Sequence, residues 1–191
     1  MGGYFTDASV FLVDTLFGLY LLAVLLRFLL QGVRADFSNP IAHFLVVVTN
    51  PPLKPLRRLI PGLYGIDLAS VVLLLLIEII YQMVLATLLG QPLVFGVLLV
   101  RGVFHLLNLL LNVYLFSILI VVVLSWVSPY PNALSQLLGR LTGPLLRPAR
   151  RWLPPLGGLD LSPMLVMIAI VLVQMALPYL QRIFDAFPGL V

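Results

Sequence analysis

Charged side chains are few in this chain, and most of them are basic. Three basic residues occur at positions i, i+3 and i+4 in one segment, and the same pattern returns in a second segment further along. On a helix this spacing puts all three charges on one side, where they can attract anionic lipid head groups or an acidic partner. The residues that we expect to bind lipid or a partner are Lys54, Arg57, Arg58, Arg147, Arg150, Arg151 and Trp152.

The alternative is that these charges only set the orientation of a membrane protein, as basic loops commonly do. An orientation signal alone does not need the prolines, the glycine and the aspartate that accompany the charges at the same positions in both segments. We therefore favour a structured element that contacts lipid or a partner. A nucleic-acid site is not indicated, because three basic residues per segment without an aromatic platform make too small a footprint.

An aspartate follows each basic segment at the start of an apolar run, Asp67 in the first and Asp160 in the second. An aspartate at this place can cap the N-terminus of a helix and interact favourably with its dipole. Ser162 adds a hydroxyl group in the second segment. We expect these three residues to be structural caps, with pairing between the aspartates and the neighbouring arginines.

Glu78 is the ionisable residue that lies midway along an apolar run. A charged group at that depth in a membrane is a functional candidate by default. A neutral carboxyl group that serves packing is the alternative, since the second copy has an aliphatic residue at the equivalent position. We expect Glu78 to face the interior of a helix bundle and to hydrogen-bond a polar residue of similar depth, from the set Tyr20, Ser117 and Gln174.

Two other charged residues, Asp14 and Arg27, lie near the ends of the first apolar run. A long side chain near the end of a span can extend its charged group to water at the interface. We therefore expect neither residue to need a protein partner.

Metal and covalent chemistry have little support in this sequence. The chain contains no cysteine and only two histidines, His43 and His105, which are too few for a typical zinc or haem site. No nucleophile–base set, metal cluster or phosphate-binding loop is recognisable in the sequence. We expect no enzymatic activity and no cofactor.

The composition indicates the elements that hold these residues. Hydrophobic residues make up 62% of the 191 residues and charged residues 9%, against about 25% charged in soluble domains. A helix that crosses the hydrocarbon core needs roughly 20 apolar residues, and four runs qualify, at 10–30, 68–89, 104–127 and 163–182. We predict an all-α integral membrane domain with four transmembrane helices.

The connections between spans one and two and between spans three and four are long. Each has a short apolar or amphipathic stretch, at 41–48 and 134–141, that is too short to cross. We predict a short interfacial helix there, followed by the Pro/Arg-rich element, whose prolines should prevent one long helix. Residues 93–100 are predicted as a short interfacial or outward-protruding helix joined to the third span, because Arg101 and Gly102 interrupt the apolar run. The sequence leaves open whether residues 93–103 continue that span or form a helix of their own.

An internal repeat is the strongest pattern in the sequence. Residues 49–68 align without gaps on residues 142–161, with eleven of twenty positions identical at a constant offset of 93. A duplication of this length is larger than a solenoid period. It predicts one membrane domain over 1–191 that is built from two tandem two-helix repeats, at about 8–91 and 102–185.

Basic residues also predict the orientation of the spans. Eight of the eleven lie in the two long connections, and short basic loops face the cytoplasm. Both termini and the turn at 90–92 are therefore expected outside. The eight residues are Arg34, Lys54, Arg57, Arg58, Arg140, Arg147, Arg150 and Arg151.

The sequence Pro-Leu-Leu-Arg-Pro-Ala-Arg-Arg-Trp-Leu-Pro-Pro-Leu-Gly-Gly-Leu-Asp-Leu-Ser-Pro at 144–163, preceded by Leu-Ser-Trp-Val at 124–127, resembles the YggT family of small membrane proteins. The resemblance covers nearly the whole chain and includes the two-copy organisation of the proteobacterial members. Copy one departs from the motif, with Ala69-Ser70 in place of Ser-Pro and Arg27-Phe28 near the place of Ser-Trp.

The resemblance implies a bacterial inner-membrane protein without an established biochemical activity. Relatives have been connected with osmotic and ion stress, with cell or plastid division and nucleoid distribution, and with maturation of a plastid cytochrome b6. This spread favours a non-enzymatic scaffold or assembly factor that binds membrane lipids and another membrane protein or a second copy of itself. The alternative is a small transport or channel component linked to osmotic or ion stress, with a polar path near Glu78.

Overall fold

The structure is a computed structural model that describes residues 3–63, 65–127, 130, 132–153 and 160–186. The proline and glycine residues predicted at 154–158 as part of the second basic element lie outside this range. The described residues form helices and no strand, which confirms the all-α prediction. The six helices are α1 (Tyr4–Gly32), α2 (Pro40–Leu59), α3 (Leu68–Leu88), α4 (Phe95–Val127), α5 (Ala133–Trp152) and α6 (Ser162–Ala186).

Four of the helices are long and apolar enough to cross a membrane: α1, α3, α4 and residues Ser162–Phe184 of α6. The four predicted spans are therefore confirmed as candidates by length and composition. The 21 residues of α3 extend about 32 Å, close to the hydrocarbon thickness of about 30 Å. The 33 residues of α4 extend about 50 Å, so α4 must tilt or project beyond the core.

The predicted interruption at Arg101 and Gly102 is wrong, because α4 runs without a break from Phe95 to Val127, so residues 95–100 continue the third span. The two residues that resembled a break make contacts between elements. Gly102 packs so closely on α3 that a Cβ atom there would lie 2.8 Å from Glu78 Cγ. Arg101 Nη1 donates to Gln91 Oε1 at 3.1 Å.

The prediction that prolines break the two basic elements is also wrong. Helix α2 includes Pro51, Pro52 and Pro55 within 20 residues, and α5 likewise continues through its own two prolines. Each proline removes one backbone hydrogen bond, but one face of each helix stays packed on the bundle. Leu53 of α2 is fully buried, and Leu146 of α5 is nearly so.

Helices α2 and α5 begin at asparagine caps that lie 93 positions apart. Asn39 Oδ1 accepts the N–H of Ile41 at 3.0 Å, and Asn132 Oδ1 accepts the N–H of Ser135 at 2.8 Å. The hydroxyl of Ser135 accepts in return from the backbone N–H of Asn132, which completes a capping box. These caps satisfy backbone donors that have no partner within the helix.

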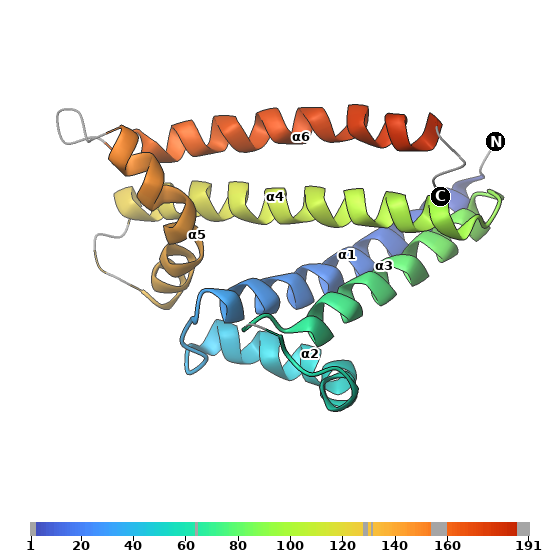
Figure 1. The fold of residues 1–191 in the computed structure, drawn as a ribbon, viewed down its shortest axis with the longest axis horizontal. Coiled ribbons are helices and arrows are strands. Elements are labelled where there is room, and N and C mark those ends of the chain that lie inside the picture. The colour runs from blue at the N-terminus through green and yellow to red at the C-terminus, as the bar shows by residue number, and fades with distance from the viewer. Residues whose placement is uncertain (1–2, 64, 128–129, 131, 154–159, 187–191) are drawn as a thin grey trace.

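The spans form two antiparallel hairpins, α1 with α3 and α4 with α6 (Figure 1). Gly90 makes the turn between α3 and α4 at a φ of +63°, a conformation that suits glycine. The N–H of Gln91 then donates to the carbonyl of Ala86 at 2.8 Å, as in a Schellman ending. The hairpins meet near this turn and spread apart toward the other end, where α2 and α5 lie (Figure 1).

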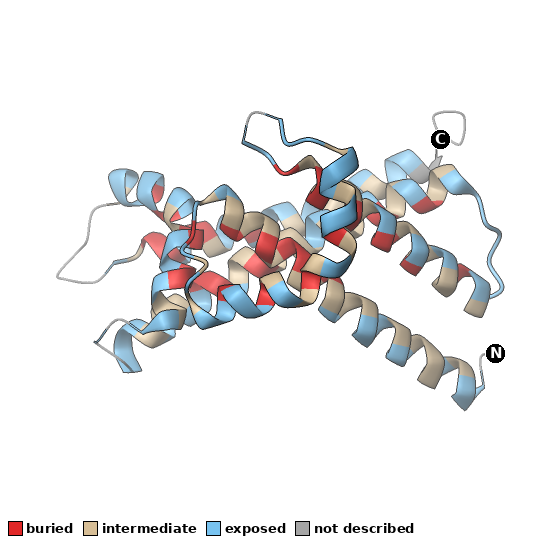
Figure 2. Ribbon diagram, turned by 90° about the horizontal axis from the view of Figure 1, so that it is seen from below, coloured by how far each residue is buried: buried red, intermediate tan, exposed pale blue. Residues whose placement is uncertain are grey.

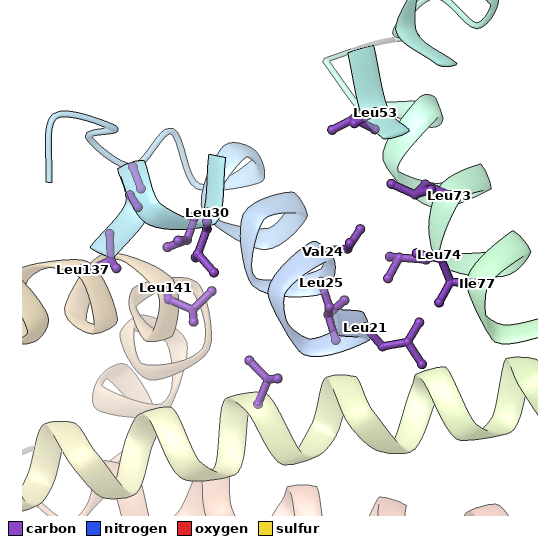
Figure 3. Close-up of a cluster of buried hydrophobic side chains, with 14 of the residues drawn as sticks. Leu21, Val24, Leu25, Leu30, Leu53, Leu73, Leu74, Ile77, Leu137 and Leu141 are labelled. Atoms are coloured by element: carbon purple, nitrogen blue, oxygen red, sulfur yellow. The ribbon is translucent and has the colours of Figure 1, made fainter. Parts of the chain in front are cut away.

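Buried residues gather along the middle of the molecule, while the outer faces of the spans remain exposed (Figure 2). Exposed apolar side chains such as Leu16 and Met175 suit helices that have lipid around them. Because lipid is as apolar as leucine, close packing holds such helices together. The first hairpin is packed by Leu21, Val24 and Leu25 of α1 and by Leu73, Leu74 and Ile77 of α3 (Figure 3).

Candidate functional site

The first basic segment contains a network that joins α2 to the start of α3. Arg57 Nε and Nη2 both donate to Asp67 Oδ2, at 3.2 and 2.5 Å. Arg57 Nη2 also donates to Gln31 Oε1 at 2.9 Å, and the hydroxyl of Ser70 donates to Asp67 at 2.6 Å. Asp67 occupies the cap position of α3, but its side chain accepts no backbone N–H. Its carboxylate therefore ties α2 to α3.

The second basic segment repeats the ion pair. Arg150 Nε donates to Asp160 Oδ2 at 2.9 Å, and Asp160 Oδ1 accepts the backbone N–H of Ser162 at 3.0 Å. Asp160 thus caps the start of α6. Ser162 is fully buried, and its Oγ has no hydrogen-bond partner in the described part of the chain.

Both aspartates are held in the charged form. Burial alone would raise the pKa of Asp67, but the hydrogen bonds from Arg57 and Ser70 outweigh burial and lower that pKa below its ordinary value. At Asp160, burial likewise opposes and the hydrogen bonds of Ser162 and Arg150 prevail, so its pKa is also lowered. One arginine of each segment is therefore engaged within the protein.

The other predicted binding residues remain exposed. Four basic side chains of α2 and α5 make no hydrogen bond or ion pair with any residue that the structure describes. Trp152, at the end of α5, is 85% exposed. We name these five residues the basic face: Lys54, Arg58, Arg147, Arg151 and Trp152.

Glu78 lies between α3 and α4 with a fully buried side chain. Its carboxylate accepts from Gln82 Nε2 at 2.9 Å, and His105 Nδ1 lies 2.9 and 3.0 Å from the two carboxylate oxygens. The expected partners were wrong, since none of Tyr20, Ser117 and Gln174 bonds to Glu78. The hairpins meet near the Gly90 turn, so α4 brings an early residue to the level of Glu78.

The same cluster extends to α1. The hydroxyl of Tyr81 donates to Asp14 Oδ1 at 2.9 Å, and the Tyr81 ring stacks on the His105 ring with centroids 5.4 Å apart. Asp14 therefore has a protein partner, contrary to expectation. Sequence reasoning did not join Asp14, Tyr81, Gln82 and His105 to Glu78, and the structure makes them one polar cluster across three spans.

Gln174 belongs to a second polar contact, between α4 and α6. Its Nε2 donates to Asn112 Oδ1 at 2.9 Å and lies 3.3 Å from Asn108 Oδ1. Nearby is a cavity of about 270 Å³ with many polar walls. Four polar residues of α4 are spaced four, three and four positions apart, which puts them in one stripe along the helix and could have been found from the sequence. They are Arg101, His105, Asn108 and Asn112. The polar side chains that line the cavity are Gln82, Arg101, His105, Asn108, Gln174 and Gln181.

Tyr20 and Ser117 lie elsewhere. Tyr20 packs against the main hydrophobic core. Ser117 is buried on α4 and lines a larger, mostly apolar cavity between the hairpins. The four polar residues that were grouped by depth are thus in separate environments.

Arg27 was expected to reach water, and this is wrong because its side chain is buried. Arg27 Nη1 donates to Thr49 Oγ1 at 2.6 Å, and Nη2 donates to Asn50 Oδ1 at 2.9 Å. Nη1 also lies 3.4 Å from the carbonyl of Val46. Arg27 therefore joins α1 to α2 just before the prolines of α2.

In the described residues, no group of three His, Asp or Glu side chains is placed to hold a metal ion.

The sequence matches the family model described as CCB3/YggT in two stretches, residues 6–88 and 100–181. It is 46% identical over 175 residues to a protein of Pseudomonas aeruginosa described as uncharacterised, covering 88% of this chain and 87% of that protein. It is 35% identical over 170 residues to the uncharacterised protein YggT of Escherichia coli, covering 88% of both.

A shorter match is to the Arabidopsis thaliana protein described as YlmG homolog protein 2, chloroplastic. The two are 40% identical over 60 residues, which is 31% of this chain and 24% of that protein. No solved structure matches the chain.

Proposed function

The chain belongs to the CCB3/YggT family, and from this premise and the geometry of α2 and α5 we propose that it is a non-enzymatic scaffold or assembly factor of the bacterial inner membrane. In this proposal α2 and α5 lie at the cytoplasmic head-group level. The basic face binds anionic lipid head groups and a second membrane protein or another copy of this chain. The residues of the basic face project from the exposed surface of α2 and α5, while Arg57 and Arg150 hold these two helices in place.

The observation that carries the proposal is the difference between the two kinds of basic residue. Arg57 and Arg150 are neutralised by aspartates of the same chain, whereas the four cations of the basic face are exposed and unpaired in the described residues. Near an anionic membrane surface each such cation contributes about 1 kcal/mol. Trp152 adds an aromatic ring of the kind that is enriched at membrane interfaces.

A tandem organisation would give the protein two such basic elements with one orientation. Three observations support it: the family model matches once in each half, the asparagine caps of α2 and α5 lie 93 positions apart, and each half has an Arg–Asp pair ten residues apart. We therefore take 8–91 and 102–185 as two copies within the single domain 1–191. Both termini lie on one side in this arrangement, since each copy crosses the membrane twice. That side is the outside, because α2 and α5 are proposed to lie at the cytoplasmic side.

A small transport or channel component is the second candidate, and the polar cavity beside His105 favours it. Conduction needs polar groups along the whole path. The polar stripe of α4 ends at Asn112, which lines the larger cavity and not the polar one, and the walls of that larger cavity are otherwise apolar apart from Ser117. The single chain thus has a polar path through one part of the bundle only. Ion flux into liposomes that contain the purified protein alone would support this candidate.

The test of the scaffold is removal of the basic face. A variant with Lys54, Arg58, Arg147 and Arg151 all changed to Gln should lose most of the anionic lipid that co-purifies, and most crosslinks to its partner in native membranes. The matched control changes Arg101 and Arg182, which are basic residues at the other end of the spans, to Gln. If lipid retention and crosslinks of the fourfold variant equal those of the control, the charges are only an orientation signal.

A further inference from the structure

A large cavity separates the two hairpins on the side where they spread apart. Its volume is about 580 Å³, and its walls come from α1, α2, α4 and α5. Most lining side chains are leucine, isoleucine, valine or phenylalanine, with Asn112 and Ser117 as the polar exceptions. Apolar walls offer water few hydrogen-bond partners, and a volume of this size suits one small ligand or chain.

A polar pocket of about 260 Å³ adjoins this cavity, and Leu137 lines both. The pocket lies between the start of α2 and the start of α5, which are joined by a 2.7 Å hydrogen bond from Asn39 Nδ2 to the carbonyl of Ala133. Leu137 and Leu141 of α5 lie near Leu30 of α1 in one apolar cluster (Figure 3). Polar and apolar walls thus adjoin in one composite site.

The polar pocket has one charge of each sign. Asp36 is exposed, and the backbone N–H of Ser38 donates to it at 2.9 Å. The hydrogen bonds of Ser38 outweigh burial and, with a smaller contribution from the charge of Arg140, lower the pKa of Asp36, so its carboxylate is ionised at neutral pH. Arg140 Nη1 lies 3.4 Å from the carbonyl of Arg34, which leaves most guanidinium donors available.

We propose that this composite site binds one phospholipid whose head group carries both a phosphate and an ammonium, as in phosphatidylethanolamine. The phosphate pairs with Arg140, the ammonium pairs with Asp36, and one acyl chain occupies the apolar cavity. Charge complementarity selects this occupant, because an anionic head group without an ammonium would leave Asp36 beside a second negative charge. A partner helix would fill the cavity but would not use the two opposite charges.

The site is distinct from the basic face, and its lipid would join the two hairpins. In a bundle whose hairpins spread apart, an acyl chain supplies the packing that neighbouring side chains do not. The inference adds to the proposed function and does not depend on it, because the two sites share no residue and select different head groups.

The test mixes purified protein with vesicles of phosphatidylethanolamine and phosphatidylglycerol in equal amounts and counts retained lipids by native mass spectrometry. Wild type should retain one phosphatidylethanolamine per chain. Arg140→Gln should lower that retention by about tenfold, as the loss of one charge-assisted hydrogen bond would. Asp36→Asn should shift the retained lipid toward phosphatidylglycerol.

A second pair of variants tests the cavity without touching a charge. Ile120→Trp fills the cavity that Ile120 lines and should also abolish retention. The matched control is Leu119→Trp, on the same helix but outside the cavity walls and exposed, which should retain the lipid.

Equal phosphatidylethanolamine retention by Arg140→Gln, Ile120→Trp and wild type would overturn the proposal. So would retention of phosphatidylglycerol in place of phosphatidylethanolamine by the fourfold variant, which lacks the anionic-lipid site of the basic face. Dimers without bound lipid would assign the cavity to a second copy instead and would also overturn it. The fourfold variant of the basic face should keep its phosphatidylethanolamine. Failure of the proposed function and failure of this inference are therefore separate results.

Discussion

Glu78 shows how a single buried residue joins the two hairpins. Its carboxylate bonds to Gln82 of its own helix and to His105 of α4. In Glu78→Gln, an amide oxygen can still accept from both partners, so we expect nearly unchanged thermal stability in detergent. In Glu78→Leu, both partners lose their acceptor, and the cost should be about 1–3 kcal/mol.

Growth under osmotic stress separates the structural role of Glu78 from a transport role. A transport role would make Glu78→Gln stable but inactive, since the amide cannot exchange a proton or bind a cation as a carboxylate does. Unchanged stability of Glu78→Leu would contradict the bridging role described here.

Gly102 provides the space that Glu78 needs. In Gly102→Ala the new methyl group would approach Glu78 Cγ to 2.8 Å, so Glu78 must move and its bond to His105 should lengthen. We expect a loss of about 1–3 kcal/mol, which is typical of overpacking, measured by thermal unfolding. Gly18→Ala is the matched control, since nothing lies within 4 Å of the added atom; it should be neutral or stabilising. Equal effects at both positions would contradict this packing argument.

The depth of Glu78 was predictable from sequence, but its partner was not. Counting residues along a span gives a level in the membrane, and hydropathy places that level well. The partner depends on how α4 is rotated and shifted against α3, and Gly102 influences both by its lack of a side chain. Arg27 was missed for a related reason: its partners, Thr49 and Asn50, belong to a helix whose packing the sequence does not show.

At the level of the helices, the Arg57–Asp67 pair fixes α2 to the start of α3 and should make stability depend on pH. The folded-state pKa of Asp67 is lowered, so its contribution is complete above the unfolded value of about 3.9 and is lost as the pH falls through the folded value. Wild type should therefore lose thermal stability in detergent as the pH falls below about 4. Asp67→Asn should be less stable at neutral pH and should show a smaller acid loss. An equal acid loss in both proteins would contradict this role of Asp67.

The two proline-containing helices show why the connections were harder to predict than the spans. Proline disfavours the interior of a helix by about 3 kcal/mol, which led to the expectation of a broken element. Asn39 and Asn132 cap the helix starts, and Leu53 and Leu146 pack on the bundle, so α2 and α5 continue. Local propensity was outweighed by tertiary packing, which is visible only once the neighbouring helices are in place.

For the molecule as a whole, the four spans followed from composition, because a chain in lipid must satisfy its backbone within each helix. The spread of the two hairpins did not follow, since lipid-facing and helix-facing leucines are alike in sequence. The cavity between the hairpins and the polar junction of α2 with α5 were therefore findings of the structure. Both lie at the end of the molecule where the basic face is found.

The central claim is that the basic face lies at the cytoplasmic surface. Because the chain has no cysteine, single cysteines at Gly3, Ile60, Gln91 and Leu153 can be labelled one at a time with a membrane-impermeant thiol reagent in intact cells. Cysteines at positions 3 and 91 should react from outside, and those at 60 and 153 should react only after the cells are opened. Labelling of positions 60 and 153 in intact cells would contradict the account, because α2 and α5 would then face away from the cytoplasm.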